Sequence, residues 1–263
     1  MILSENHITR LKQLACEAGA AILDIYNHAD DFGIEQKEDE SPLTIADKKS
    51  NDIICRGIEA LELDYPIISE ENLQIPYEIR KNFKRYWLVD PLDGTKEFIK
   101  RNGDFTVNIA LIEGDRPVAG FVYAPFLQEL YWAISGQGAY FEKAREIIKL
   151  EVASFDIRSE GLKVVTSGSH MNEATLALIN KLNSPTIVNR GSSLKFLLLA
   201  KAEAQYYPRM SQTMEWDLAA GQIILEEAGG KVLDLSGKTM LYNKESMKVA
   251  AFIASGNGHP FID

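Results

Sequence analysis

Two aspartates, Asp90 and Asp93, lie at the end of an apolar run, within the segment VDPLDGTKEF. The proline between them cannot donate to a strand ladder, so we expect the chain to turn there and both carboxylates to face one space. Gly94 permits a positive φ, and Thr95 can begin a short helix whose free N–H groups favour an anion such as phosphate. The segment therefore offers two hard oxygen ligands, which favour Mg²⁺, Mn²⁺ or Ca²⁺ over zinc or copper, beside a phosphate cradle.

Two further acids, Glu70 and Asp217, lie elsewhere in the chain. Glu70 follows the apolar run IIS, and Asp217 lies in the first turn of a predicted helix, in the segment TMEWDLAAG. Large apolar neighbours predict that Asp217 is buried, and a buried carboxylate needs a partner such as a metal ion. Taken singly, each acid has a simpler interpretation: a turn at Asp90, a solvated pair at Glu70 and Glu71, and compensation of the helix dipole at Asp217.

Hydrophobic periodicity predicts the elements that position these acids. Apolar residues recur at helical spacing over residues 6–27 and about 45–61, which predicts two helices. Thr44 and Asp47 have the composition of a cap at the start of the second helix. Short apolar runs just before Glu70 and before Asp90 predict buried strands, and the polar stretch between the two helices predicts a loop or hairpin.

The middle of the chain predicts an antiparallel meander, with strands at residues 105–112, 118–124 and 129–134. After about residue 158, strand and helix patterns alternate, and the last helix, over 215–228, is closed by Gly229. This order predicts a layered α/β or α+β fold whose two lobes share a cleft. We place an N-terminal lobe at 1–157 and a C-terminal lobe at 158–263.

Composition limits the classes of partner. The 263 residues carry a formal net charge of −10, which argues against nucleic-acid binding but not against one small phosphorylated ligand held by local cations. Cys16 and Cys55 each lie in an apolar helical pattern, which predicts reduced core thiols. The first residues read as a helix rather than a signal peptide, and no apolar run could span a bilayer, so we expect a cytoplasmic protein and leave peripheral membrane contact open.

Three widely separated motifs resemble the inositol monophosphatase family of metal-dependent phosphatases, and they match in order along nearly the whole chain: Glu70-Glu71, then Asp90 to Thr95, then Trp216-Asp217 with Ala219-Ala220-Gly221. Within this family, the segments SGSH, GSSLKF and YPR resemble the 3′(2′),5′-bisphosphate nucleotidases of the CysQ type. Where that group usually has Gly-Pro before a threonine, this chain has Ser211-Gln212. The resemblance implies a layered αβαβα sandwich.

The same resemblance implies two or three Mg²⁺ ions. It assigns a first ion to Glu70, Asp90 and the carbonyl of Leu92, and a second to Asp90, Asp93 and Asp217. A further, weaker ion shares Glu70. Two metal ions about 3.5–4 Å apart would bind the phosphoryl oxygens and stabilise both the attacking and the leaving oxygen of an in-line displacement.

The resemblance also implies which groups handle the substrate. It assigns Asp47 and Thr95 to orienting and deprotonating the attacking water, and the backbone N–H groups of Gly94 and Thr95 to the reacting phosphate. It assigns Ser192, Lys195 and Arg209 to a second, non-reacting phosphate and places His170 near the nucleoside. A solvated helix face for Lys195, and a helix cap or surface imidazole for His170, are the simpler alternatives.

The substrate that this resemblance implies is adenosine 3′,5′-bisphosphate, with its sulfated form, 3′-phosphoadenosine 5′-phosphosulfate, as a second possibility. An inositol monophosphatase or fructose-1,6-bisphosphatase with the same metals is the nearest alternative, and a non-catalytic Ca²⁺ or Mg²⁺ binder is another. Phosphatases with an aspartyl or cysteinyl nucleophile are excluded, because the chain has no D-x-D and no C-x5-R. We expect a monomer, with a homodimer as the alternative.

Overall fold

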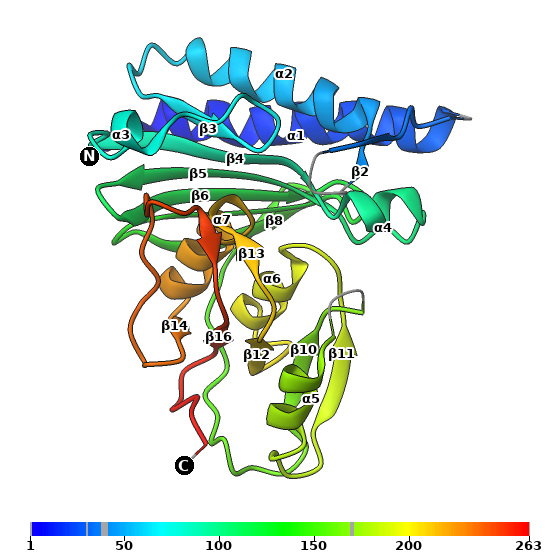
Figure 1. Cartoon of the computed structure of the whole chain (residues 1–263), viewed down its shortest axis with the longest axis vertical. Coiled ribbons are helices and arrows are strands. Elements are labelled where there is room, and N and C mark those ends of the chain that lie inside the picture. Colours follow the sequence, from blue (N-terminus) through cyan, green and yellow to red (C-terminus); the bar gives the residue numbers. More distant parts are fainter. Residues whose placement is uncertain (1, 30, 38–41, 169–170, 263) are drawn as a thin grey trace.

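The computed structural model describes residues 2–29, 31–37, 42–168 and 171–262. Its first layer consists of two helices, α1 (Glu5–His28) and α2 (Ile45–Glu59), which lie together over one face of a sheet (Figure 1). The side chain of Ser4 caps α1 and that of Thr44 caps α2, each by accepting a backbone N–H of the first turn. Both helices are amphipathic, and their apolar faces are buried against the sheet.

The first sheet has seven strands within the described residues, in the order β3-β4-β5-β6-β7-β8-β9. Only β3 and β4 pair in parallel, and the later strands form an antiparallel meander. The strands are β3 (Ile67–Ser69), β4 (Arg85–Asp93), β5 (Thr106–Glu113), β6 (Arg116–Ala124), β7 (Glu129–Ile134), β8 (Gly138–Lys143) and β9 (Glu146–Lys149).

Apolar side chains cover both faces of this sheet. Along β4, Trp87 and Val89 face the layer of α1 and α2, whereas Tyr86 and Leu88 face the opposite side. A strand that is apolar at every position is expected where both faces of a sheet are covered. The sheet is therefore a central layer, and its polar residues are confined to special positions such as Asp90.

The opposite face is covered by α6 (Leu194–Ala200) and α7 (Glu215–Glu227), which separate it from a second sheet (Figure 1). This sheet has five described strands in the order β11-β10-β12-β16-β14. They are β10 (Lys163–Thr166), β11 (Thr186–Asn189), β12 (Tyr206–Arg209), β14 (Lys231–Asp234) and β16 (Phe252–Ser255). On its outer face, α5 (Glu173–Ile179) buries Ile179 against Val164 and Tyr206, which completes an αβαβα sandwich as predicted.

Helix α7 packs very closely against the first sheet. A Cβ atom added to Gly120, on β6, would lie 2.8 Å from the carbonyl oxygen of Ala220 and 2.4 Å from a methyl carbon of Ile223. Only glycine permits this approach. This close packing fixes the distance between α7 and the sheet, and so the position of the first turn of α7 relative to the sheet.

The remaining elements are short. They are the paired strands β1 (Glu35–Gln36) and β2 (Pro42–Leu43), the paired strands β13 (Thr213–Met214) and β15 (Lys248–Val249), and the helices α3 (Tyr77–Arg80) and α4 (Thr95–Ile99). Helix α4 begins after Gly94, whose φ is +94°, as the sequence predicted. Strand β9 was not predicted, because Ile147 and Ile148 are both exposed and show no alternation.

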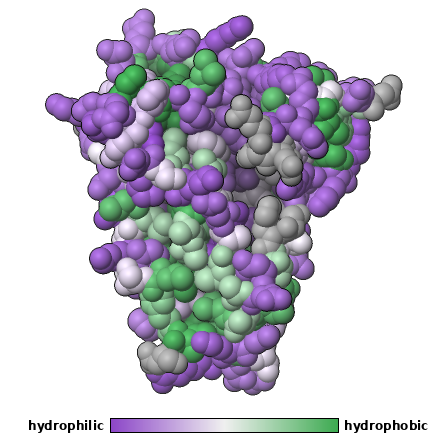
Figure 2. Space-filling view, in the orientation of Figure 1, coloured by the Kyte–Doolittle hydropathy of each residue, from purple (hydrophilic) through white to green (hydrophobic). Residues whose placement is uncertain are grey.

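Seen from the same side, the surface around α1 and α2 is mostly hydrophilic, while apolar residues gather on the lower, C-terminal part (Figure 2). Among the helices in the described residues, none combines the length and the apolar composition of a transmembrane span. The division into lobes at residues 157 and 158, the cytoplasmic location and the monomeric state stay predictions.

Candidate active site

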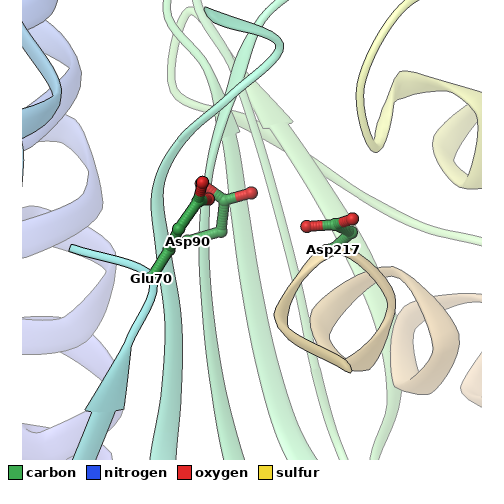
Figure 3. Close-up of side chains that lie close together, drawn as sticks. All are labelled: Glu70, Asp90 and Asp217. Carbon is green, nitrogen blue, oxygen red and sulfur yellow. The ribbon is translucent and has the colours of Figure 1, made fainter. Parts of the chain in front are cut away.

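Among the described residues, Glu70, Asp90 and Asp217 bring one carboxylate oxygen each within 4.8 Å of one another. Their side chains point into one space, with Glu70 and Asp90 on one side and Asp217 on the other (Figure 3). Glu70 directly follows β3 and Asp90 lies in β4, and because these strands pair in parallel, both acids reach the same edge of the sheet. Asp217 comes from the first turn of α7 beneath that edge.

The strand that carries Asp90 does not turn at Pro91, and that prediction was wrong. Strand β4 continues to Asp93, with one extra residue between the pairs Asp90–Asn108 and Asp93–Thr106. In a regular strand, residues three apart face opposite sides, but an inserted residue shifts the alternation by one. The bulge therefore turns both aspartates to the same side. Pro91, which has no backbone N–H, lies where the ladder of hydrogen bonds is interrupted.

Asp93 is held beside the three acids by side chains from two other elements. Its Oδ2 accepts from the Ser193 hydroxyl at 3.0 Å and from the Asn108 amide at 3.3 Å. The Ser193 hydroxyl also lies 3.2 Å from the carbonyl oxygen of Asp217. Asp93 does not belong to the set within 4.8 Å, but Ser193 fixes its position next to the start of α7.

Burial and repulsion between neighbouring carboxylates disfavour the charged forms of Glu70, Asp90 and Asp93. Burial, followed by the charge of Asp217, raises the pKa of Glu70 to about 7 and that of Asp93 to about 6. Burial also raises the pKa of Asp90 well above its usual value, and the charges of Glu70 and Asp93 add to this effect. Buried like charges are costly unless a cation joins them.

This donor set fits a divalent metal ion. The predicted ligand atoms are all hard oxygens, from Glu70, Asp90, Asp93, Asp217 and the carbonyl of Leu92, and all five residues line one cavity. Such a set suits Mg²⁺, Mn²⁺ or Ca²⁺, and it lacks the nitrogen and sulfur ligands that zinc and copper prefer. The Leu92 carbonyl also lies 3.2 Å from the Thr95 hydroxyl, so the segment after Asp90 is locally braced.

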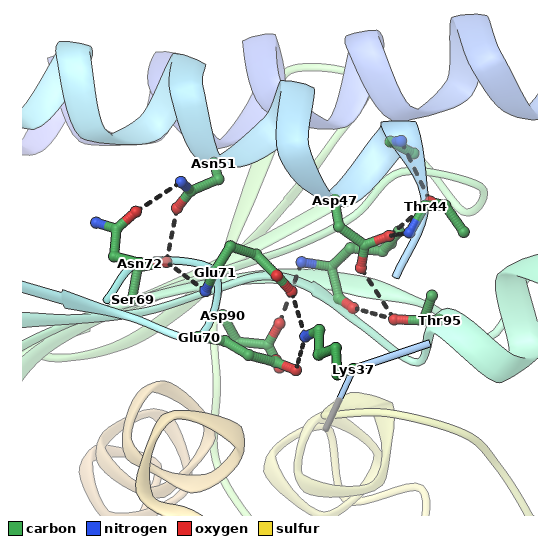
Figure 4. A network of polar contacts seen from close by, with 12 residues as sticks. Lys37, Thr44, Asp47, Asn51, Ser69, Glu70, Glu71, Asn72, Asp90 and Thr95 are labelled. Carbon is green, nitrogen blue, oxygen red and sulfur yellow. Dashed lines mark hydrogen bonds and ion pairs between the residues drawn. The ribbon is translucent and has the colours of Figure 1, made fainter. Parts of the chain in front are cut away.

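One cation beside the acids was not predicted. Lys37 directly follows β1, and its ammonium donates to Glu70 at 2.7 Å and to Glu71 at 2.6 Å (Figure 4). Burial favours the neutral amine, but the two carboxylates outweigh it and raise the pKa of Lys37. Nothing in the sequence pattern indicated this contact, because Lys37 lies in a polar stretch rich in charged residues.

Asp47 and Thr95 also meet at this site. The Thr95 hydroxyl donates to Asp47 Oδ1 at 3.0 Å, while Asp47 Oδ2 accepts from the backbone and hydroxyl of Thr44 at 2.8 and 2.5 Å (Figure 4). Burial raises the pKa of Asp47 above its usual value, against the opposing effect of these hydrogen bonds. A carboxylate with a raised pKa is a better proton acceptor, and Thr95 is positioned to pass it a proton.

The acids open into a cavity of about 430 Å³ that is also lined by Lys195 and Arg209. Lys195 is buried, and its ammonium donates to the carbonyl of Ser192 at 2.6 Å. The Ser192 side chain is also buried, and its hydroxyl has no hydrogen-bond partner within the described part of the chain. A buried hydroxyl without a partner at a cavity wall is a candidate ligand contact.

Arg209 is braced by backbone groups of the next segment. Its guanidinium donates to the carbonyls of Ser211 at 3.4 Å and Gln212 at 3.2 Å. The unusual Ser211-Gln212 pair thus supplies main-chain acceptors, which do not depend on the side chains. His170 lies outside the described residues, so its expected place near a nucleoside stays a prediction.

The chain is similar to known proteins over nearly its full length. A model of the inositol monophosphatase family matches residues 4–260. The curated 3′(2′),5′-bisphosphate nucleotidase CysQ of Salmonella typhimurium is 45% identical over 230 residues, which cover 88% of this chain and 91% of that protein.

Solved structures agree with this similarity. CysQ from Bacteroides thetaiotaomicron, a bacterial member of the inositol monophosphatase family, aligns with a TM-score of 0.86 at 35% identity, covering 97% of this chain and 99% of its own. An IMPase from Thermotoga maritima aligns with a TM-score of 0.76 at 26% identity, covering 93% of this chain and 89% of its own.

Proposed function

This chain belongs to the inositol monophosphatase family, and we propose that it is a Mg²⁺-dependent phosphomonoesterase that converts adenosine 3′,5′-bisphosphate to AMP and phosphate. One observation carries the proposal. A single cavity joins the acid cluster of Glu70, Asp90 and Asp217 to a separate pair of cations, Lys195 and Arg209. A substrate with two phosphates would use both ends, whereas a simple polyol monophosphate would need only the acids.

The acids would hold the metal ions at the reacting phosphate. Glu70, Asp90 and the Leu92 carbonyl form one ligand set, and Asp90, Asp93 and Asp217 form another. Bound Mg²⁺ would supply positive charge to the phosphoryl oxygens and favour ionisation of the attacking water. Gly94 and Thr95 line the same cavity, and their backbone N–H groups would orient the phosphate.

Asp47 and Thr95 would manage the proton of the attacking water. The Thr95 hydroxyl directs its hydrogen toward Asp47 Oδ1 at 3.0 Å, which leaves its lone pairs able to accept from a water in the cavity. As the water attacks phosphorus, its proton passes to Thr95 while the Thr95 proton passes to Asp47. The bond between phosphorus and the ribose oxygen breaks, and the leaving oxygen is protonated by solvent.

Lys195, Arg209 and Ser192 would bind the 5′-phosphate. Arginine offers a planar fork of donors and lysine a single charge, and both suit a phosphate monoester. The unpartnered Ser192 hydroxyl would supply a further donor. The sulfated nucleotide presents a similar 5′ group, so we propose it as a second substrate.

Steady-state kinetics with three substrates test the proposal. We expect the highest kcat/KM for adenosine 3′,5′-bisphosphate, a lower value for adenosine 3′-monophosphate, and the lowest for inositol 1-phosphate. Arg209→Ala should lower kcat/KM for the bisphosphate by about ten- to a hundredfold and leave the monophosphate little changed. The exposed Arg145→Ala variant serves as a matched control for loss of one arginine.

Faster turnover of inositol 1-phosphate than of either nucleotide would reject the nucleotide assignment and favour an inositol monophosphatase. An absence of phosphate release from all three substrates with Mg²⁺, Mn²⁺ or Ca²⁺ would reject an enzymatic role and favour a cation-binding protein.

A further inference from the structure

Asp104 lies between the loop of the reacting phosphate and the loop of the second phosphate. We infer that Asp104 is a positioning residue that fixes the spacing between Gly94, at the acid cluster, and Ser192, at the 5′-phosphate. The bisphosphate substrate in this inference rests on the proposed function, whereas the contacts of Asp104 do not. It makes Asp104 a determinant of specificity for substrates with two phosphates.

The side chain of Asp104 reaches the second loop directly. Its Oδ2 accepts the backbone N–H of Gly191 at 2.8 Å, and its Oδ1 lies 3.8 Å from a guanidinium nitrogen of Arg190. The Asp104 side chain is 20% exposed, so water screens the contact only in part. A charged acceptor makes a stronger hydrogen bond to a backbone N–H than a neutral one.

The backbone of Asp104 is packed tightly against both loops. A Cβ atom added to Gly94 would lie 2.7 Å from the Asp104 carbonyl oxygen and 3.3 Å from the Ser192 Cβ. A Cβ atom added to Gly191 would lie 2.8 Å from the same carbonyl oxygen. The two loops therefore approach each other across one residue, and both need glycine to do so.

Ser192 needs such support because its backbone is strained. Its φ is +44°, a left-handed conformation that residues other than glycine adopt only where their surroundings impose it. Asp104 holds the preceding residue, Gly191, and the Ser192 carbonyl in turn accepts from Lys195 at 2.6 Å. A contact at Asp104 thus determines where both the Ser192 hydroxyl and the Lys195 ammonium lie.

Substrates with one and two phosphates should respond differently to the loss of this contact. A substrate with only the reacting phosphate uses the acids and Gly94, which keep their own supports. A bisphosphate must reach both loops at once, so an altered spacing weakens its binding. The Asp104 carboxylate should therefore affect KM for the bisphosphate more than kcat.

The test compares three variants on two substrates that differ only in the 5′-phosphate. Asp104→Ala should lower kcat/KM for adenosine 3′,5′-bisphosphate at least tenfold, mainly through KM, and change the value for adenosine 3′-monophosphate less than twofold. Asp104→Asn keeps an acceptor for Gly191 and should stay within threefold of the unsubstituted protein on both. Asp234→Ala removes another aspartate that caps loop N–H groups, at 2.8 and 2.9 Å, and should change neither.

Amide hydrogen exchange gives a second measurement that needs no turnover. Without substrate, exchange at residues 191–193 should be faster in Asp104→Ala and unchanged in Asp104→Asn and Asp234→Ala. Asp104→Ser replaces the alanine variant if that does not fold. Equal losses on both substrates, no loss on either, or unchanged exchange would overturn the inference. A failure of the proposed function is distinct, because it appears in the unsubstituted protein, either as no phosphate release or as faster turnover of inositol 1-phosphate than of either nucleotide.

Discussion

The Thr95 hydroxyl donates to Asp47 Oδ1 at 3.0 Å, although the two residues are 48 positions apart. The other oxygen of the same carboxylate accepts from Thr44 and caps α2. The capping interpretation and the catalytic interpretation of Asp47 are therefore compatible, because each uses a different oxygen atom. Helix α2 positions the carboxylate, and Thr95 connects it to the cavity.

Removing the Thr95 hydroxyl should impair the chemical step more than binding. We expect Thr95→Val to lower kcat about 10²- to 10⁴-fold with little change in KM, because it breaks the route from water to Asp47. Thr95→Ser keeps the hydroxyl and should retain most activity. Because the two residues act together, Thr95→Val combined with Asp47→Asn should be hardly slower than the worse single variant, as measured by a double-mutant cycle. Additive losses would separate their roles.

Neutralising Asp90 should abolish most of the activity without lowering the stability of the metal-free protein. Asp90→Asn removes a buried charge from among like charges, so the metal-free variant should have a Tm equal to or above that of the unsubstituted protein. Activity should fall at least 10³-fold, and added Mg²⁺ should no longer raise Tm. Calorimetry with and without Mg²⁺ checks this, with the exposed Asp52→Asn as control. A Mg²⁺-induced rise like that of the unsubstituted protein would remove Asp90 from the metal site.

Replacing Lys37 should make the protein more dependent on metal. In Lys37→Met, Glu70 and Glu71 lose the cation that contacts both, so Tm without metal should fall and the rise caused by saturating Mg²⁺ should grow. The control is Lys48→Met, which removes an exposed pair with Glu35 at 2.8 Å and should have little effect. An unchanged response to Mg²⁺ would show that Lys37 does not influence the metal ligands.

The raised pKa of Glu226 should make the stability of the protein depend on pH, independently of the active site. Burial raises its pKa to about 7, although Gln222 donates to it at 2.9 Å and Arg116 opposes the shift. The folded protein therefore retains a proton that the unfolded chain releases near its usual pKa of about 4.5, so stability falls as pH rises from about 4.5 to 7. Glu226→Gln lacks this loss, and its Tm advantage should grow between pH 5 and 8.

Thermal unfolding across that pH range measures the difference, with the exposed Glu146→Gln as control. A Tm advantage for Glu226→Gln that shrinks with rising pH would contradict the assignment.

The sequence was most informative where periodicity and burial agree. The first helix, the meander and the last helix follow from apolar patterns that tertiary packing does not override. The end of β4 did not follow, because a proline can be accommodated by a bulge as well as by a turn, and only the partner strand distinguishes these outcomes. Strand β9 is an exposed edge whose residues lack alternation.

The acids of the candidate site were predicted from residue types, the roles of its other residues came from the family resemblance, and the contacts that support the site were not predicted. Acids at the ends of apolar runs are visible in one sequence, and the structure places Glu70, Asp90 and Asp217 together. Lys37, Ser193 and Asp104 act through contacts with distant residues, and nothing in their local sequence distinguishes them from other polar loop residues. Such partners become apparent only when the fold brings the segments together.

The acids of the cluster come from distant parts of the polypeptide, since Glu70 precedes Asp217 by 147 residues and Asp90 precedes it by 127. During synthesis, the early acids leave the ribosome long before α7 has been translated. A growing or prematurely terminated polypeptide therefore carries an incomplete set of candidate ligands, so the proposed metal binding and hydrolysis must await the emergence of the C-terminal segments.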